Sequence, residues 1–162
     1  MITSAHDFKL VQAHLAGAVT IITTCNTEGQ LRGFTATSFC SLSLEPPLVL
    51  FCLNTAADSY GAFANGSSFA VNILSAQQRD LSQRFATKGD TKYQDILFEQ
   101  GQTGTPLLPH CLAYLECSIY AIYPGGDHHI IVGLVRHGQL GLERHDAQPL
   151  LYYTRTYGTF TS

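Results

Sequence analysis

Tight turns between short β-like segments constrain the fold of this chain most. Runs rich in β-branched and aromatic residues favour strands, and they recur along most of the sequence. The turn 26–29 separates the first two runs, and Pro46 with Pro47, which cannot donate to a sheet, separates two more. Strands joined by such turns pair antiparallel, whereas a doubly wound nucleotide fold needs repeated helical crossovers. We therefore expect a mainly β fold, an antiparallel Greek-key barrel, with strands at 18–25, 31–35, 35–44, 48–53, 69–74, 112–122, 130–135 and 150–153.

A few short helices are expected beside this barrel. The first places Phe8, Val11 and Leu15 on one side, and we expect that side to pack on a sheet. The second lies within 58–66, where an Asn-Gly pair ends it. The third follows Ser75, a predicted N-cap.

Composition narrows the class of protein. With 162 residues, of which 45% are hydrophobic and 13% charged, the chain has the size of one domain, residues 1–162. A net charge of −3 without a basic run argues against a nucleic-acid partner. The sequence shows neither a secretory signal nor an apolar run long enough to cross a membrane. The five cysteines form no C-x-x-C pair, which is typical of core thiols in a reducing compartment. We expect a cytoplasmic protein with no nucleic-acid or membrane partner.

The segment 35–44 concentrates small hydroxyl side chains before Pro46 and Pro47. Hydroxyl groups and the backbone amides beside them are compact donors, which could hold a phosphorylated cofactor in a barrel. A strand with one face in water would have the same composition, and the residues alone leave both interpretations open. Neither of the usual glycine-rich phosphate loops is present in the sequence.

A second candidate site lies at the bend Gly125-Gly126-Asp127-His128. Asp127 can orient or charge the imidazole of His128, and glycines allow a ligand to approach the backbone closely. A solvated hairpin turn with incidental histidines is the alternative. A metal site is disfavoured, because adjacent strand residues such as His128 and His129 point to opposite faces.

Together these segments resemble the flavin reductase-like family of FMN-binding split barrels. More narrowly, the chain resembles the small reductase component of two-component flavin-dependent monooxygenases. The resemblance runs from about Phe8 to Tyr157. It rests on Thr35 to Phe39, Ser41 to Val49, Val71 to Ser75, Arg84 to Ala86, Gly126 to His128 and Pro149 to Tyr153.

The resemblance implies a split-barrel homodimer that binds flavin against the hydroxyl-rich segment near the subunit interface. Contacts to the isoalloxazine and ribityl parts would come from Thr35, Ala36, Thr37, Ser38 and Ser41, with Cys52, Leu53 and Asn54 nearby. The phosphate end would lie near Ser59, Arg84 and Phe85, and the flavin-side loops would be held by Asn72 and Ser75. His128 would meet the nicotinamide as the catalytic residue, and Tyr153, Thr154, Arg155 and Thr156 would help to enclose it.

Two positions depart from the family pattern. After the final strand the family commonly carries aromatic-Arg-Gly-x-aromatic, whereas this chain has Thr154 at the arginine position and Arg155 at the glycine position. Leu134 stands where many members have an acidic residue.

The expected function is an NAD(P)H:flavin oxidoreductase, in which hydride passes from NADH or NADPH to FMN or FAD. The reduced flavin would then leave for a partner monooxygenase. Since the cofactors carry the redox chemistry, the protein mainly aligns two rings. A flavin-binding carrier or sensor on the same barrel is the alternative, because fold does not fix function. The sequence does not choose between FMN and FAD or between NADH and NADPH.

Overall fold

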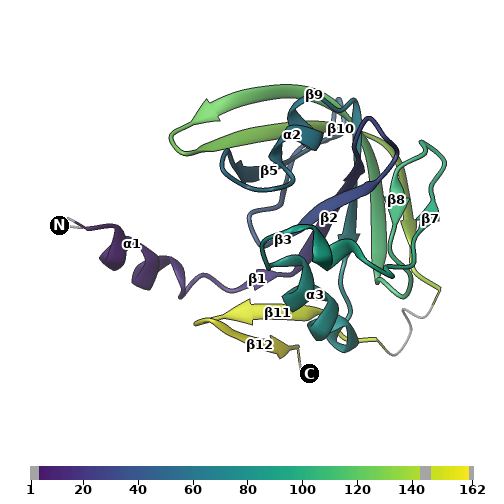
Figure 1. Ribbon diagram of the computed structural model, residues 1–162. Coiled ribbons are helices and arrows are strands. Elements are labelled where there is room, and N and C mark those ends of the chain that lie inside the picture. Colours follow the sequence, from purple (N-terminus) through teal and green to yellow (C-terminus); the bar gives the residue numbers. More distant parts are fainter. Residues whose placement is uncertain (1–3, 143–146, 161–162) are drawn as a thin grey trace.

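A single antiparallel sheet of seven strands forms the body of the molecule (Figure 1). The computed structural model describes residues 4–142 and 147–160. The strands follow the order β3-β2-β6-β9-β10-β5-β4 across the sheet. Their bounds are β2 (Thr20–Cys25), β3 (Leu31–Ala36), β4 (Cys40–Ser43), β5 (Leu48–Asn54), β6 (Ser68–Ile73), β9 (Ala113–Gly125) and β10 (His128–Leu140).

Two smaller sheets complete the β structure. One joins a strand that follows α1 to the last two strands of the chain, in the order β1-β11-β12. It lies below the main sheet in Figure 1. The other is the pair β7-β8. Their bounds are β1 (Gly17–Ala18), β11 (Leu150–Tyr153), β12 (Thr156–Thr159), β7 (Glu99–Gln100) and β8 (Pro106–Leu107).

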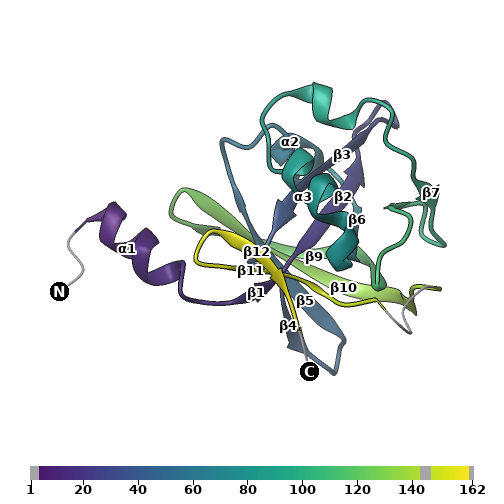
Figure 2. The ribbon, with the colours of Figure 1, turned by 90° about the horizontal axis from the view of Figure 1, so that it is seen from below.

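The helices are short and lie outside the barrel. They are α1 (Ala5–Gln12), α2 (Tyr60–Ala64) and α3 (Arg79–Phe85), with 3-10 turns η1 (Ala76–Gln78) and η2 (Asp90–Tyr93). In both Figure 1 and Figure 2, α1 extends away from the body. None of its residues is buried.

Aromatic packing shows how the sheet curls into a barrel. Phe34 of β3 and Phe51 of β5 belong to strands near opposite ends of the sheet order, yet their ring centroids lie 5.7 Å apart. Phe63 of α2 and Phe69 of β6 pack on the same Phe51 ring at 5.6 and 5.0 Å. Edge-to-face contacts of this kind add to the free energy gained by burial. This cluster closes one side of the barrel.

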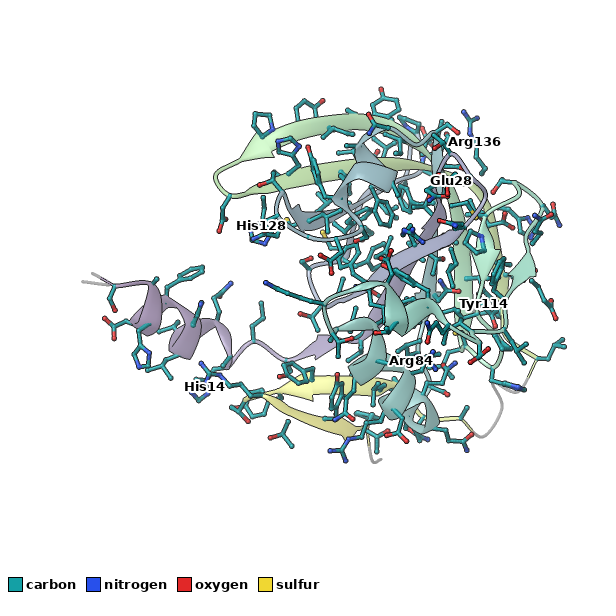
Figure 3. All side chains as sticks on the ribbon, in the orientation of Figure 1. His14, Glu28, Arg84, Tyr114, His128 and Arg136 are labelled. Carbon is teal, nitrogen blue, oxygen red and sulfur yellow. The ribbon has the colours of Figure 1, made fainter. Side chains whose placement is uncertain are left out.

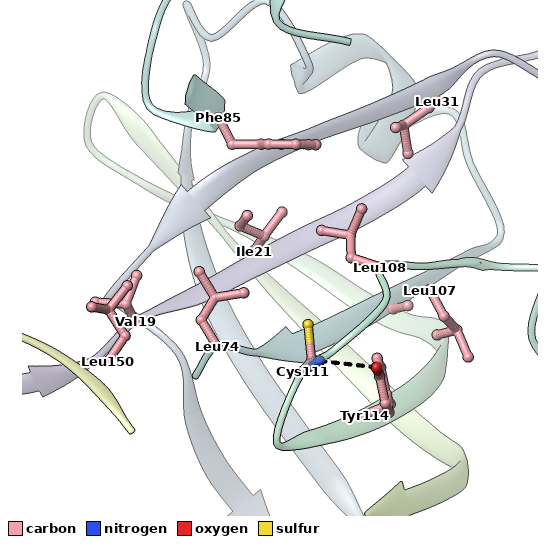
Figure 4. Packing of buried hydrophobic residues seen from close by; sticks show 11 residues of the cluster. Val19, Ile21, Leu31, Leu74, Phe85, Leu107, Leu108, Cys111, Tyr114 and Leu150 are labelled. Atoms are coloured by element: carbon pink, nitrogen blue, oxygen red, sulfur yellow. Dashed lines mark hydrogen bonds between the residues drawn. The ribbon is translucent and has the colours of Figure 1, made fainter. Parts of the chain in front are cut away.

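A second buried cluster fixes α3 on the sheet (Figure 4). Phe85 lies over β2 and β3 among Ile21 and Leu31. The approach is close, because a Cβ at Gly33 would meet the Ile22 carbonyl oxygen at 2.6 Å and the Phe85 ring at 3.2 Å. Ala86, which directly follows α3, lines a cavity beside the sheet.

The predicted antiparallel β fold with few helices is confirmed, and two expectations about elements are wrong. Residues 35–44 are not one strand, because β3 ends at Ala36 and β4 begins at Cys40. The apolar side of the first helix does not pack on a sheet, since Phe8, Val11 and Leu15 are 54%, 57% and 72% exposed. Strand β12 was not predicted, and β9 and β10 run longer than expected.

Candidate functional site

Three segments far apart in the sequence meet at one end of the barrel. The Ser38 hydroxyl, just beyond β3, donates to the Cys52 carbonyl at 3.2 Å and accepts from the Cys52 amide at 3.3 Å. In the next strand pair, His128 of β10 lies opposite Asn54 of β5. The Thr55 amide donates to the Asp127 carbonyl at 3.1 Å. The hydroxyl-rich segment and the Asp127-His128 bend lie far apart in the sequence. In the structure, both flank the same strand, β5.

His128 is held by its neighbour Asp127. Its Nδ1 lies 2.7 Å from Asp127 Oδ1, and 41% of the imidazole side chain is exposed. An ionised carboxylate only accepts hydrogen bonds, so Nδ1 carries the proton and Nε2 remains for a ligand. The hydrogen bond from His128 lowers the pKa of Asp127. Figure 3 shows His128 on the side of the hairpin that faces α1 and the lower sheet.

A cavity of about 210 Å³ opens beside the hydroxyl-rich segment. Its lining comes from Val19, Thr35, Thr37, Ala86, Tyr152 and Tyr157. The Thr35 hydroxyl already donates to the Ser82 carbonyl at 2.6 Å and so anchors α3. Thr37 is exposed, and its hydroxyl has no hydrogen-bond partner among the described residues. Thr37 is the hydroxyl that can bind a ligand here.

Ser59 is buried without a partner. It is 1% exposed, and Ser59 Oγ is the one buried side-chain polar atom of the described residues that lacks a hydrogen bond. A buried hydroxyl left unpaired costs about 1–3 kcal/mol. Its neighbour Asp58 accepts from the Gly89 amide at 2.6 Å, which ties this loop to the loop after α3. An unpaired buried hydroxyl is expected where a ligand supplies the missing partner.

Several predicted site residues make contacts within the protein. The Asn72 amide, fully buried, bonds to Ile21, Thr23 and Leu108. Ser75 forms the predicted capping box with Gln78. The Arg84 guanidinium donates to the carbonyls of Lys92 and Gln94, so it holds η2 and has fewer donors left for a phosphate. The side chains of Ala36, Leu53 and Phe85 belong to the core, and Ser41 is exposed on β4.

The turn between β11 and β12 brings four predicted residues together. Tyr153, Thr154, Arg155 and Thr156 are exposed, and Thr154 and Arg155 have φ values of 46° and 63°. This left-handed conformation favours glycine or asparagine, which accounts for the glycine usual at the Arg155 position. The Thr154 amide donates to the Ala13 carbonyl at 2.7 Å and so holds the segment that leads from α1.

Two contacts near the site were not foreseen. Tyr60 Oη lies 2.8 Å from His129 Nδ1, so α2 is tied to β10 beside His128. Tyr152 and Tyr157 pack with centroids 5.0 Å apart and form a wall of the cavity. The aromatic residues of the last two strands could have indicated that wall. Nothing in the sequence links Tyr60 to His129.

Similarity to known proteins identifies the family of this chain. The flavin reductase like domain matches residues 12–161. The chain belongs to this family. The reductase subunit HsaB of a flavin-dependent monooxygenase from Mycobacterium tuberculosis is 35% identical over 93% of this chain and 79% of its own. A flavin reductase from Pseudomonas putida is 32% identical over 96% of this chain and 89% of its own.

Solved structures agree with that membership. The NADH:FAD oxidoreductase SgcE6 of Streptomyces globisporus, in complex with NAD and FAD fragments, superposes with a TM-score of 0.88. It is 29% identical, and the match covers 99% of this chain and 97% of that chain. The predicted family, the split-barrel fold and the enzyme class of flavin reductase are confirmed.

The site fits a flavin by its own chemistry. Ser59 Oγ is buried and unpaired, and the Thr37 hydroxyl is open to a cavity.

Within 4–142 and 147–160, no group of three His, Cys, Asp or Glu side chains could hold a metal ion. In the same ranges, no helix has the length and apolar character needed to span a membrane.

Proposed function

We propose that this protein is an NAD(P)H:flavin oxidoreductase that reduces FMN or FAD and supplies it to a partner monooxygenase. When bound, the nicotinamide supplies a hydride that the flavin accepts. The observation that carries the proposal is the meeting of the hydroxyl-rich segment, the end of β5 and the Asp127-His128 bend at one end of the barrel. Family membership supports the same activity.

The chain's own residues act mainly by positioning. Thr37 offers a hydroxyl beside the cavity, Ser38 ties this segment to Cys52 of β5, and Ser59 offers a buried hydroxyl for the phosphate end of a flavin. His128, oriented by Asp127 through Nδ1, would hold the nicotinamide carboxamide through Nε2. No side chain is needed as a nucleophile, and proximity of two rings supplies most of the rate enhancement.

Steady-state oxidation of NADH and NADPH with added FMN or FAD tests this proposal. Turnover supports the reductase. Tight flavin binding without turnover of either dinucleotide would instead identify a carrier or sensor. Absence of any fluorescence quenching on titration with both flavins would refute a flavin site altogether.

The flavin site itself is tested by replacing Ser38 and Ser41 together with leucine. The bulky apolar side chains should raise the flavin dissociation constant at least about tenfold, or ~1.4 kcal/mol. Ser67→Leu, on an exposed residue away from this segment, is the matched control. Unchanged flavin affinity in a folded double variant would remove the assignment.

A homodimer belongs to the same proposal. The helix α1 exposes Phe8 and Val11 without any buried residue of its own, and Leu15 just beyond it is also exposed. An isolated helix of eight residues is unstable in water, so α1 needs a surface on which to pack. We propose that a second copy of the chain provides it. A cytoplasmic location is supported by five cysteines that are all free thiols.

A further inference from the structure

A second groove adjoins the cavity beside the hydroxyl-rich segment. It has a volume of about 460 Å³ and lies between α3 and the β11-β12 hairpin. Ala86, Tyr152 and Tyr157 line both the groove and the cavity. A ligand bound against Thr37 could therefore extend past the two tyrosines into the groove.

The charge of this groove is positive in a protein whose net charge is −3. Its lining includes Arg79 and Arg155 and contains no aspartate or glutamate. Neither guanidinium forms an ion pair with a carboxylate among the described residues. Asp80 follows Arg79 in the sequence and does not line the groove. Two unpaired guanidiniums at one groove are suited to phosphate oxygens, which they can bind in pairs.

The aromatic surface between the arginines suits a base. Arg79 Cζ lies 5.7 Å from the Tyr157 ring centroid, and Tyr157 Oη bonds to the Ser82 hydroxyl at 2.9 Å. The tyrosine ring is therefore fixed on α3 beside a cation. A fixed aromatic face next to a guanidinium is a common stacking platform for nucleobases.

The backbone supports a binding role for Arg155. Its φ of 63° lies in the left-handed region, which a side chain with a Cβ adopts at a cost. A non-glycine residue at such a φ points to function when its side chain is exposed and makes no contact that repays the strain.

We infer that this groove binds the adenosine diphosphate half of a dinucleotide, with Arg79 and Arg155 on the phosphates and the Tyr152-Tyr157 pair beside the base. FAD, NADH and NADPH all contain this half, whereas FMN does not. The inference deepens the proposed function and rests on it for the identity of the whole ligand.

Calorimetric titration of this chain with ADP tests the inference directly. Wild type should bind ADP, and the double variant R79Q with R155Q should bind at least about tenfold more weakly. R136Q removes the same charge from an exposed residue on β10, far from α3 in Figure 3, and should bind as wild type does. ADP affinity in the double variant equal to that of R136Q, or no ADP binding by wild type, would overturn the inference.

Two further titrations identify the source of the ADP half. If it belongs to the flavin, the double variant should lose affinity for FAD and keep its affinity for FMN. If it belongs to the nicotinamide cofactor, the KM for NADH or NADPH should rise while the affinity for FAD stays unchanged. A larger rise for NADPH than for NADH would place the 2′-phosphate in the groove.

The failure of this inference and that of the proposed function are distinguishable. A protein that binds ADP through both arginines but oxidises neither dinucleotide would refute the reductase and retain the groove. An active reductase whose ADP affinity is the same in wild type, R79Q and R155Q would do the reverse.

Discussion

Among single residues, Ser59 has a hydroxyl that is both buried and unpaired. Its removal should therefore have opposite effects on protein stability and on flavin affinity. We expect Ser59→Ala to stabilise the ligand-free protein by up to about 1 kcal/mol, because an unsatisfied buried group is removed. The same variant should raise the flavin dissociation constant about five- to tenfold. Urea unfolding without flavin and a flavin titration measure both effects, with Ser67→Ala as control. A destabilised variant with normal flavin affinity would show that the hydroxyl serves the fold.

His128 carries the prediction about hydride transfer. His128→Ala should leave flavin affinity nearly intact and lower kcat/KM for NADH by roughly ten- to a hundredfold, a loss of about 1.4 to 2.7 kcal/mol in transition-state stabilisation. Asp127→Asn should give a smaller loss, because it weakens only the 2.7 Å contact that orients the imidazole. Stopped-flow reduction of bound flavin measures the step.

His129→Ala is the control for His128→Ala. Because His129 contacts Tyr60, this control also removes a hydrogen bond that stabilises the fold. His129→Ala should cost about 1 kcal/mol of stability through the lost hydrogen bond and leave the rate of flavin reduction close to that of wild type. A larger kinetic defect in His129→Ala than in His128→Ala would show that the nicotinamide does not lie at His128.

Among the elements, β9 anchors the loop that connects β7 to β8. The carboxylate of Glu116, 1% exposed, accepts from the amides of Gln102 and Thr103 at 3.0 and 2.7 Å. It also accepts from the hydroxyls of Thr103 and Thr105 at 2.5 and 3.1 Å. Gly101 is required beside it, since a Cβ there would lie 2.5 Å from the carboxylate. Burial raises the pKa of Glu116, but these hydrogen bonds outweigh burial and hold it below the usual value.

The stability that Glu116 provides should therefore depend on pH. A carboxyl group whose pKa is lowered by folding stabilises the protein above its unfolded pKa of about 4.3, and this contribution disappears as the pH falls through the folded pKa. Glu116→Gln should cost at least about 2 kcal/mol at pH 7, and its difference from wild type should narrow below about pH 4. Urea unfolding across this pH range measures both values. A difference that stays constant down to pH 3 would contradict a charged carboxylate here.

The elements also show how far the sequence predicts this molecule. Turn residues and β-branched runs predicted the antiparallel sheet, because each is a local property of a few neighbours. The break between Ala36 and Cys40 was missed, since it arises where Ser38 turns to bond with Cys52 on a distant strand. The use of the Arg84 guanidinium on the η2 carbonyls is likewise a long-range contact. The contact between Asp127 and His128 could be predicted from the sequence, because both residues lie within one turn.

For the whole molecule, the exposed side of α1 predicts association. Phe8→Glu with Val11→Glu should weaken the dimer at least about a hundredfold, because burying two such side chains contributes about 3–6 kcal/mol. Sedimentation at micromolar protein should show the dimer mass for wild type and the monomer mass for the double variant. His6→Glu, on the opposite side of the helix, should remain dimeric. Identical sedimentation of wild type and double variant would exclude α1 as the contact.

The small lower sheet determines when the site can form during synthesis. Gly17 and Ala18 leave the ribosome long before Tyr152 and Leu151, the residues with which they pair. All seven strands of the main sheet emerge before β11 does. A nascent chain can therefore assemble its barrel while the Tyr152 wall of the cavity is still missing. Capture of the ligand then becomes possible only after β11 has been synthesised and has paired with β1.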